Sequence, residues 1–333
     1  MVGFGRGVPI PAKPILIGDI GGTNARFALL GETGIGPIDR LRTGDYPTPE
    51  AAIGRFLAAH GGSAAIGGMA LAVAGPVEAG RCALTNSHWV LDTEALRRAS
   101  GLSSVRLVND FEATAWSLPR LKPEDLVPVG GGPPDRNAPA LAMGPGTGLG
   151  VACYLPGSGR ATVLPSEGGH ATMAASDARE AAVIAELWKQ FGHVSAERLL
   201  SGDGLGHLYG ALARLDQAQV PARTPEEITQ AALDQNCPQS HAALTMFCAM
   251  LGSVAGNLAL TFRAAGGIYI AGGIMPRLTR FLTGTRFRER FEQKGRPRPW
   301  LERVPIFVII QPDAAMIGLQ TLLGARLTLA PRP

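Results

Sequence analysis

The sequence has few cysteines, and none of them lies close to another. The four cysteines among 333 residues are Cys82, Cys153, Cys237 and Cys248, and no C-x-x-C or C-x-C pair is present. This spacing argues against a structural zinc site and against a disulfide framework. Isolated thiols suit a reducing compartment, so we expect a cytoplasmic protein.

The N-terminal stretch lacks the continuous apolar run of a signal peptide. It reads MVGFGRGVPIPAKP, which is rich in glycine and proline, and we expect residues 1–13 to form a disordered tail. Segment 242–262 is uncharged and long enough to cross a bilayer as a helix, but it is solitary, and polar and small residues dilute it. We therefore expect a buried helix packed closely on a neighbour, and no membrane association.

Charge of one sign is nowhere concentrated enough to predict a nucleic-acid partner. The chain has 31 Lys and Arg against 27 Asp and Glu, a net charge of +4 and a pI near 9.1, but the basic residues are scattered. The densest basic run, RFRERFEQKGRPR at 286–298, mixes Glu289, Arg290 and Glu292 on one helix face. We predict a solvated helix there.

Two common nucleotide-binding signatures are absent. No G-x-G-x-x-G opens a helix, and no G-x-x-x-x-G-K-[ST] occurs, which excludes a Rossmann fingerprint and a P-loop. Instead, apolar runs flank the glycine-rich stretches GDIGGTN, within 14–30, and GPGTGLG, within 139–155. β-like residues follow both, so each segment predicts a β-hairpin with a turn of phosphate size. A third segment, 266–282, reads as strand, Gly272-Gly273 and helix.

The length of the chain predicts two domains, or one domain of two lobes. Because two lobes each open with a glycine-rich hairpin, we expect an α/β protein with an internal duplication and a cleft between the lobes. The expected boundaries give a small α/β domain over 14–118 plus 313–333 and a large α/β domain over 119–312.

The two glycine turns share a chemistry suited to anions. Consecutive backbone N–H groups unhindered by Cβ atoms can face anionic oxygens, and Thr23 and Thr147 add hydroxyl donors. Asp19 precedes the first turn and can hold the water shell of a magnesium ion. One such turn alone is more often an ordinary tight hairpin, but two with matching chemistry favour nucleotide phosphates.

Further polar residues have both a functional and a structural interpretation. Glu167 and His170 flank a Gly-Gly and can together grip hydroxyls, or they can be a solvated carboxylate and a histidine bonded to its own backbone. Glu197 follows Ser195, a predicted N-cap, where the helix dipole favours negative charge. The other histidines show no metal-ligand spacing.

The stretch LVNDFEATAW, residues 107–116, places Asn109 and Asp110 where an apolar strand ends and a helix begins. Either side chain can cap that helix. Adjacent polar residues at the carboxyl end of a strand also lie where open α/β sheets bind ligands. From the spacing alone, capping and catalysis remain equally favoured.

Taken together, these segments resemble the bacterial glucokinases, which belong to the hexokinase-like, actin-fold superfamily of sugar kinases. The matching stretches run in family order from about residue 15 to the late 310s: GDIGGTNARFAL, TNSHW, NDFEA, GPGTGLGVA, EGGH, HVSAERLLSG, SVAGNLAL and GGIYIAGGI. The chain departs from the family pattern in two places: the second glycine turn contains Pro145, and Asp203 stands where proline is expected. It also lacks the zinc-binding C-x-C-G cluster of the related kinase and repressor family.

The resemblance implies a two-lobed, actin-like and ribonuclease-H-like sugar-kinase fold with a central cleft. It implies transfer of the ATP γ-phosphoryl group to the 6-hydroxyl of glucose, the first step of glycolysis, by a homodimer that needs Mg²⁺. Asp110 is then the general base, and the other sugar ligands are Asn109, Glu167, His170 and Glu197. The residues expected to face the nucleotide are Asp19, Gly21, Gly22, Thr23, Asn24, Gly146, Thr147, Gly148, Gly272 and Gly273, with Asp19 holding Mg²⁺ through water.

Two alternatives accompany this hypothesis. The same fold can act on another hexose, or use polyphosphate as the donor. A sugar-sensing regulator without catalysis is a rival of a different class, but it needs a DNA-binding segment, and neither the N-terminal tail nor the C-terminal ARLTLAPRP is expected to hold a helix-turn-helix.

Overall fold

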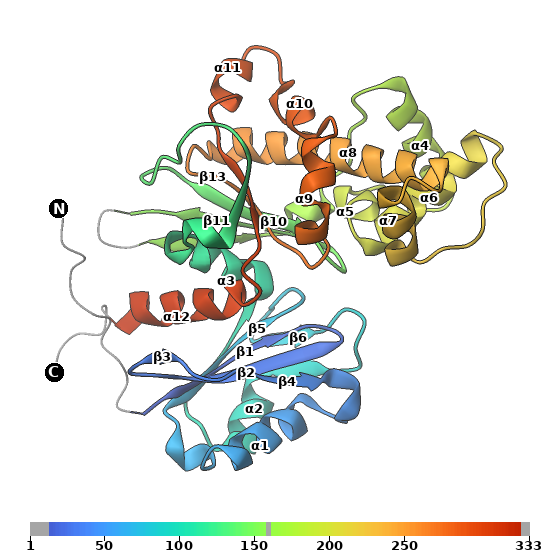
Figure 1. Ribbon diagram of the computed structural model, residues 1–333. Coiled ribbons are helices and arrows are strands. Elements are labelled where there is room, and N and C mark those ends of the chain that lie inside the picture. Colours follow the sequence, from blue (N-terminus) through green and yellow to red (C-terminus); the bar gives the residue numbers. More distant parts are fainter. Residues whose placement is uncertain (1–12, 158–160, 328–333) are drawn as a thin grey trace. The chain divides into compact units, whose positions relative to one another are not determined.

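The structure, a computed structural model, describes residues 13–157 and 161–327 (Figure 1). The expected tail over residues 1–13 lies outside the described residues except for Lys13, whose Nζ donates to the Ala64 carbonyl at 2.8 Å. The chain divides into two compact units. Unit 1 comprises Met1–Leu121, Gly157–Val163 and Pro312–Pro333, and unit 2 comprises Lys122–Pro156 and Leu164–Gln311.

Unit 1 is built on a six-stranded mixed sheet. Its strands are β1 (Ile15–Ile20), β2 (Asn24–Gly31), β3 (Gly34–Ile35), β4 (Asp39–Arg42), β5 (Gly68–Val73) and β8 (Val105–Asn109). The order is β3-β2-β1-β5-β8, with β4 also on β2. β1 and β2 form the antiparallel hairpin predicted from the sequence, whereas β1, β5 and β8 are parallel. Every residue of β5 is buried, as in a parallel strand covered on both faces.

Helices cover both faces of this sheet, with α1 (Pro49–Ala59) and α2 (Thr93–Ser100) on one face, and α3 (Asp110–Ser117) and α12 (Ala314–Leu327) on the other (Figure 1). Asp92 caps α2 by accepting from the Ala95 amide at 2.9 Å, as predicted. α12 packs so closely on α3 that a Cβ at Gly318 would lie 1.7 Å from the Ala113 carbonyl oxygen. A two-stranded sheet, β6 (Arg81–Ala83) and β7 (Val90–Asp92), also belongs to this unit.

Unit 2 repeats the plan of the first sheet. Its strands are β9 (Leu126–Gly130), β10 (Ala140–Pro145), β11 (Leu149–Leu155), β12 (Thr162–Ser166), β13 (Gly267–Ile270) and β14 (Ile306–Ile309), in the order β12-β11-β10-β13-β14-β9. The predicted hairpin is present as antiparallel β10 and β11, and β10, β13 and β14 are parallel. In both sheets a central strand therefore has its hairpin partner on one side and two parallel strands on the other, the pattern that an internal duplication predicts.

The helices of unit 2 include one long apolar helix. They are α4 (Ala178–Trp188), α5 (Ala196–Leu199), α6 (Gly202–Leu215), α7 (Pro225–Leu233), α8 (Pro238–Phe262), α9 (Met275–Thr283), α10 (Phe287–Glu292) and α11 (Arg298–Leu301). α8 is long and apolar enough to cross a membrane, but 72% of its most apolar window is buried inside the protein. Gly252 and Gly256 let α10 approach, because Cβ atoms there would lie 2.1 and 2.5 Å from the carbonyl oxygens of Phe287 and Phe291. The prediction of a closely packed core helix is confirmed.

The prediction of a solvated helix at 286–298 is wrong for α10. Phe287, Phe291 and Arg290 are buried, and only 3% of the Arg290 side chain is exposed. Its guanidinium donates to both carboxylate oxygens of Glu180, at 2.6 and 2.7 Å, and to the Ser253 hydroxyl at 3.1 Å. A buried guanidinium is tolerated when carboxylate and hydroxyl partners satisfy its donors, and the spacing of charges in the sequence does not reveal such partners.

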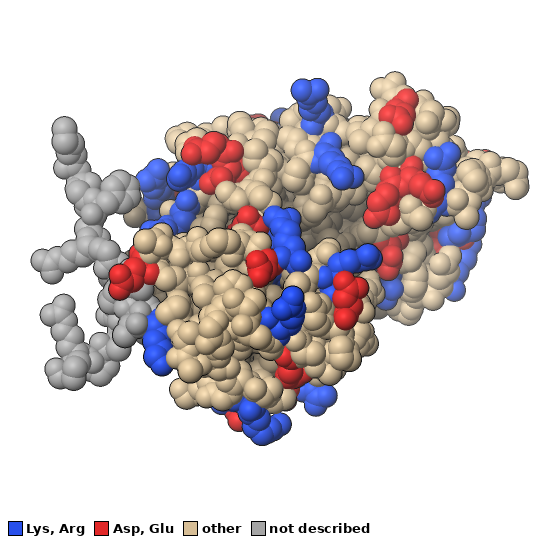
Figure 2. All heavy atoms as spheres, turned by 60° about the horizontal axis from the view of Figure 1, so that its bottom comes forward, with Lys and Arg blue, Asp and Glu red and all other residues tan. Residues whose placement is uncertain are grey.

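Charge elsewhere on the surface is mixed, as the scattered basic residues predict. Figure 2 shows lysines and arginines interspersed with acidic side chains over the face that it draws. Among the described residues on that face, no broad patch of a single sign is visible.

Candidate active site

The predicted site residues of unit 1 meet at one edge of its sheet. β1, β5 and β8 are parallel, and their register pairs Ile20 with Val73 and Val73 with Asn109. Their carboxyl ends therefore lie side by side. Asp19 lies next to the end of β1, Asn109 ends β8, and Asp110 begins α3. Ligands of open α/β sheets bind at such an edge.

Asn109, rather than Asp110, is the N-cap of α3. Its Oδ1 accepts hydrogen bonds from the amides of Phe111 and Glu112, at 2.9 and 3.2 Å, and its Nδ2 donates to the Gly75 carbonyl at 3.1 Å. These bonds fix the orientation of the side-chain amide at the start of α3. Asp110 is the first helical residue, and its Oδ1 also accepts from the Phe111 amide, at 2.9 Å.

The carboxyl group of Asp110 has an unusual proton affinity. Its pKa is raised to about 7, chiefly by burial and in addition by the neighbouring Asp19 carboxylate, against the opposing effect of hydrogen bonds from the Phe111 amide, its own amide and the Asn109 side chain. A carboxyl that titrates near neutrality is suited to accept a proton from a substrate and to release it again. Such perturbed groups gather at functional sites.

Asp19 adds negative charge to the same edge. Burial raises its pKa, Arg26 lowers it and Asp313 raises it. Arg26 lies 3.6 Å from an Asp19 carboxylate oxygen and 3.2 Å from one of Asp313, so one guanidinium lies between two carboxylates. With Asp110 nearby, acidic groups outnumber basic ones, which fits a divalent cation. No group of three or more potential metal ligands occurs in the described part of the chain, so such an ion would need water or substrate oxygens as its remaining ligands.

The turn between β1 and β2 presents the predicted phosphate-binding residues. The Gly21 amide donates to the Asn24 carbonyl at 2.9 Å, and Thr23 and Asn24 are exposed. Thr43 braces the turn through a hydroxyl hydrogen bond to the Gly22 carbonyl at 2.6 Å. A Cβ at Gly22 would lie 2.7 Å from the carbonyl oxygen of Thr85, within the TNSHW stretch. Nothing local in the sequence identifies Thr43 as a support of this turn.

A matching edge in unit 2 brings the other two glycine motifs together. The β10–β11 turn holds Gly146 to Gly148, with the Gly146 amide bonded to the Gly148 carbonyl at 2.8 Å. Gly146 and Thr147 are exposed. Gly272 follows β13, has φ +112°, and would place a Cβ 2.2 Å from the Pro145 carbonyl oxygen, so only glycine fits there. Gly273 is exposed next to it.

Glu167, His170 and Glu197 form a polar cluster in unit 2. One His170 ring nitrogen lies 3.8 Å from a Glu167 carboxylate oxygen, and the other lies 3.6 Å from Glu197 Oε1. The side chains of Glu167 and His170 are 65% and 60% exposed, and that of Glu197 is 30% exposed. Carboxylates and an imidazole that converge in this way can bind several hydroxyl groups at once. Ser195 caps α5 as predicted, by accepting from the Arg198 amide at 3.1 Å.

Glu197 has a further partner that sequence reasoning missed. Its Oε2 accepts a hydrogen bond from the Leu149 amide, at 2.8 Å, just beyond the β10–β11 turn. The polar cluster and the glycine turn are therefore joined directly within unit 2. The two residues are too far apart in sequence for any local pattern to relate them.

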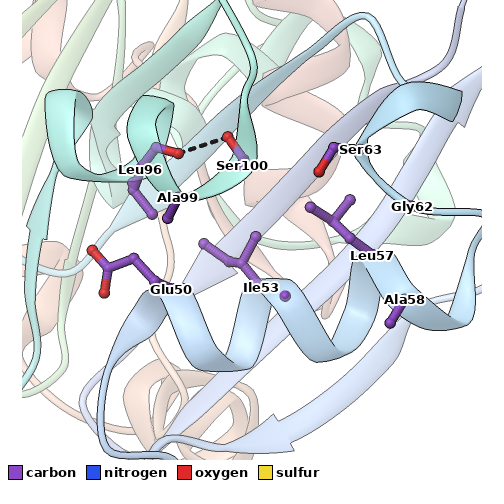
Figure 3. A pocket seen from close by; sticks show the side chains of 10 residues that line it. Glu50, Ile53, Leu57, Ala58, Gly62, Ser63, Leu96, Ala99 and Ser100 are labelled. Atoms are coloured by element: carbon purple, nitrogen blue, oxygen red, sulfur yellow. Dashed lines mark hydrogen bonds between the residues drawn. The ribbon is translucent and has the colours of Figure 1, made fainter.

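A pocket of about 220 Å³ lies elsewhere in unit 1, between α1 and α2 (Figure 3). Its lining is largely apolar, with Ile53, Leu57 and Leu96 facing the space. Ser100 contributes a hydroxyl, which already donates to the Leu96 carbonyl at 2.6 Å. The pocket contains none of the residues predicted for the site, and its lining offers little to bind a polar substrate.

Comparison with known proteins gives consistent matches over nearly the whole chain. A family model described as Glucokinase matches residues 16–326. A glucokinase of Paramagnetospirillum magneticum is 48% identical over 314 residues, which cover 93% of this chain and 98% of that protein. The crystal structure of a glucokinase from an Antarctic psychrotroph is 36% identical with a TM-score of 0.82, covering 93% of this chain and 98% of that one.

A more distant structural likeness supports the same fold. A glucokinase of the ROK family from Streptomyces griseus has a TM-score of 0.62 at 20% identity and covers 93% of this chain and 98% of that one. These likenesses confirm the predicted two-lobed, actin-like fold class of sugar kinases. Because the family model and the relative span almost all of the sequence, the chain belongs to the glucokinase family of ATP-dependent hexose kinases.

Proposed function

We propose that this chain transfers the γ-phosphoryl group of ATP to the 6-hydroxyl of D-glucose, giving glucose 6-phosphate and ADP in the first step of glycolysis. The observation that carries the proposal is the state of Asp110, which is held at the start of α3 and has its pKa raised to about 7 by burial and by Asp19. The Streptomyces griseus structure, described as a complex with glucose and AMPPNP, gives a precedent for both ligands on this fold.

Asp110 is the proposed general base. Phosphoryl transfer needs in-line positioning, stabilisation of charge on the transferring group and an acceptor for one proton, and it needs little covalent chemistry from the protein. The Phe111 amide fixes one carboxylate oxygen of Asp110 at 2.9 Å, which orients the group before substrate arrives. Asp110 would accept the proton of the 6-hydroxyl group while the oxygen of that hydroxyl attacks the γ-phosphorus of ATP.

The proposed hexose ligands are Asn109, Asp110, Glu167, His170 and Glu197. Asn109 would bind one hydroxyl through its side-chain amide, while the exposed heads of Glu167 and His170 and the fixed carboxylate of Glu197 would bind other hydroxyls. A wrong epimer would leave one of these groups without a partner, and unpaired polar groups are costly in a site that excludes water. Selectivity for one hexose is the expected consequence.

The nucleotide is proposed to bind at the two glycine turns, with Gly272 and Gly273 near the adenosine. The exposed tips at Thr23, Asn24 and Thr147 offer donors to phosphate oxygens, and the exposed Gly146 leaves room for a phosphate to approach because it has no side chain. The excess of carboxylates around Asp19 supports a site for Mg²⁺. When bound, Mg²⁺ supplies positive charge that offsets the charge of the phosphates.

The decisive experiment is a coupled assay of ADP release with glucose and ATP. We expect glucose-dependent turnover with the wild-type protein. A panel of other hexoses, and polyphosphate in place of ATP, tests the choice of acceptor and donor. Equal turnover with an unrelated acceptor, or none with glucose, would contradict the proposal.

Asp110→Asn tests the assignment of the base. Removal of the acceptor is expected to lower kcat at least about a hundredfold, while glucose binding stays measurable by calorimetry because the amide can still hydrogen-bond to a hydroxyl. Normal turnover in this variant would refute the role of Asp110.

The cytoplasmic location and the homodimer remain proposals. The four free cysteines are buried, which supports a reducing compartment. Light scattering of the purified protein measures the oligomeric state directly.

A further inference from the structure

The backbone of Leu149 is where the proposed hexose ligands and the proposed nucleotide turn of unit 2 make contact. Its N–H donates to Glu197 Oε2 at 2.8 Å. Its carbonyl oxygen lies against Gly169, between Glu167 and His170, where a Cβ would approach it to 2.1 Å. The backbone of one residue, directly after the β10–β11 turn, is therefore packed against both halves of the polar cluster.

Gly148, the residue before it, is a glycine for an unexpected reason. Its φ is not among the positive values that L side chains avoid, so its backbone conformation is open to other residues. A Cβ at this position would lie 2.3 Å from Glu197 Oε2 and 3.0 Å from Glu197 Cδ, and the third nearest atom is Glu197 Cγ at 3.8 Å. The space beside Gly148 is filled by the carboxylate of Glu197.

We propose that Gly148 is a positioning residue for the hexose: by lacking a side chain, it lets the Leu149 amide hold the Glu197 carboxylate in its sugar-binding position. This inference rests on the proposed function. The β10–β11 turn then has a second role besides facing phosphates, because the absence of a side chain at Gly148 determines the position of the Glu197 carboxylate.

The expected effect of Gly148→Ala on glucose binding depends on which neighbouring atom the added methyl group displaces. The first atom that a Cβ meets is the end of a flexible side chain and not backbone, so Gly148→Ala is accommodated by displacement of the Glu197 carboxylate. That movement breaks the bond to the Leu149 amide and takes Oε1 from its place 3.6 Å from His170. The chain is expected to fold, but with a misplaced hexose ligand.

The test is calorimetric titration of glucose without any nucleotide, so that a role toward phosphates cannot affect the result. We expect Gly148→Ala to weaken glucose binding at least about tenfold. Gly146→Ala is the matched control: it lies in the same turn, is exposed, and its Cβ would have no heavy atom within 4 Å. Its glucose affinity is expected to stay within about twofold of wild type.

A double-mutant cycle tests whether the effect passes through Glu197. In a Glu197→Ala background, Gly148→Ala is expected to cause no further loss of glucose affinity, because the group it displaces is gone. The double variant also covers the case in which Gly148→Ala alone does not fold because its methyl group crowds Glu197. With Glu197 replaced by alanine that crowding is gone, so the double variant is expected to fold. Thermal unfolding checks the fold of each protein.

Three outcomes would overturn the inference. They are an unchanged glucose affinity in Gly148→Ala, an equal loss in Gly146→Ala, and a loss that persists in the Glu197→Ala background. Failure of the proposed function gives a different result, because the wild-type protein itself would then neither bind glucose nor release ADP with it.

Discussion

At the scale of single residues, the raised pKa of Asp110 predicts how activity depends on pH. The carboxylate is the form that accepts a proton, and it is lost as the pH falls through about 7. We therefore expect kcat/KM for glucose to fall about tenfold per pH unit below that value, at constant free Mg²⁺. A profile that stays flat from about pH 5 to 8 would contradict this assignment.

The same pKa shift predicts an effect on stability. Asp110 titrates at about 7 in the folded chain against an ordinary value of 3.8, so folding favours its protonated form. The ionised carboxylate is thus a cost to stability that is fully present above pH 7, shrinks as the pH falls through 7, and is absent below 3.8. Asp110→Asn is expected to raise the Tm by about 2 °C or more at pH 8, and by less at pH 5.

Differential scanning calorimetry at the two pH values measures this difference. Asp45→Asn is a suitable control, because Asp45 is exposed and its replacement should leave the Tm nearly unchanged at both. A lower Tm for Asp110→Asn at pH 8 would show that the ionised carboxylate stabilises the fold.

At the scale of helices and strands, the local sequence predicted several elements but not the hydrogen bonds and ion pairs that fix them in place. The two hairpins and the caps Asp92 and Ser195 follow from a few neighbouring residues. Asn109 and Asp110 remained equivalent as caps, because the choice depends on which oxygen reaches the amides of Phe111 and Glu112. That choice is a matter of backbone geometry at the strand end, which residue types do not encode.

Contacts between distant segments explain what the sequence could not predict. The charged pattern of α10 resembled an exposed face because Glu180, the partner of Arg290, lies more than a hundred residues away. Likewise, the local sequence around Glu197 indicates its place in the first turn of α5 but not its bond to the Leu149 amide, which lies 48 residues away. Which side chains form such pairs depends on the tertiary structure, whereas helix and strand propensities and hydrophobic periodicity predict only local structure.

The ion pair between α10 and α4 leads to a prediction on stability. Arg290→Ala leaves the Glu180 carboxylate, which is 2% exposed, without its main partner and is expected to lower the free energy of unfolding by about 3–5 kcal/mol. Replacing both, as Arg290→Met with Glu180→Leu, is expected to cost less, because no buried charge remains.

Urea denaturation measures these differences. Arg298→Ala is the matched control: Arg298 and Glu302 are 2.9 Å apart but 55% and 46% exposed, and their loss is expected to cost less than about 1 kcal/mol. If Arg290→Ala were no more harmful than this control, the buried pair would not be a major contact of the unit.

At the scale of the whole molecule, the chain places the proposed site residues at equivalent points of two similar sheets. Each set follows the carboxyl ends of parallel strands or a hairpin turn, at Asp19 and Asn109 in unit 1 and at Gly146 and Gly272 in unit 2. The order of the motifs predicted this organisation, since the same glycine hairpin occurs twice. The fold class was therefore accessible from the sequence.

Binding of glucose should stabilise the whole molecule. A ligand that binds only the folded chain raises the free energy of unfolding by about 2.7 kcal/mol at a hundred times its Kd. A clear rise in Tm with glucose is expected, and galactose, which differs at one hydroxyl, should give a much smaller rise at the same concentration. Equal shifts with both sugars would show that the polar cluster does not select between epimers.

The close packing of α12 on α3 also has a consequence for how the protein is made. Gly318 rests against the Ala113 carbonyl, in the helix that begins at Asp110. A ribosome synthesises α3 and all of unit 2 before it reaches α12. During translation α3, which begins with the proposed base, is therefore made long before α12, the helix that packs on it. The nascent chain can complete the fold of unit 1 only after α12 has emerged from the ribosome.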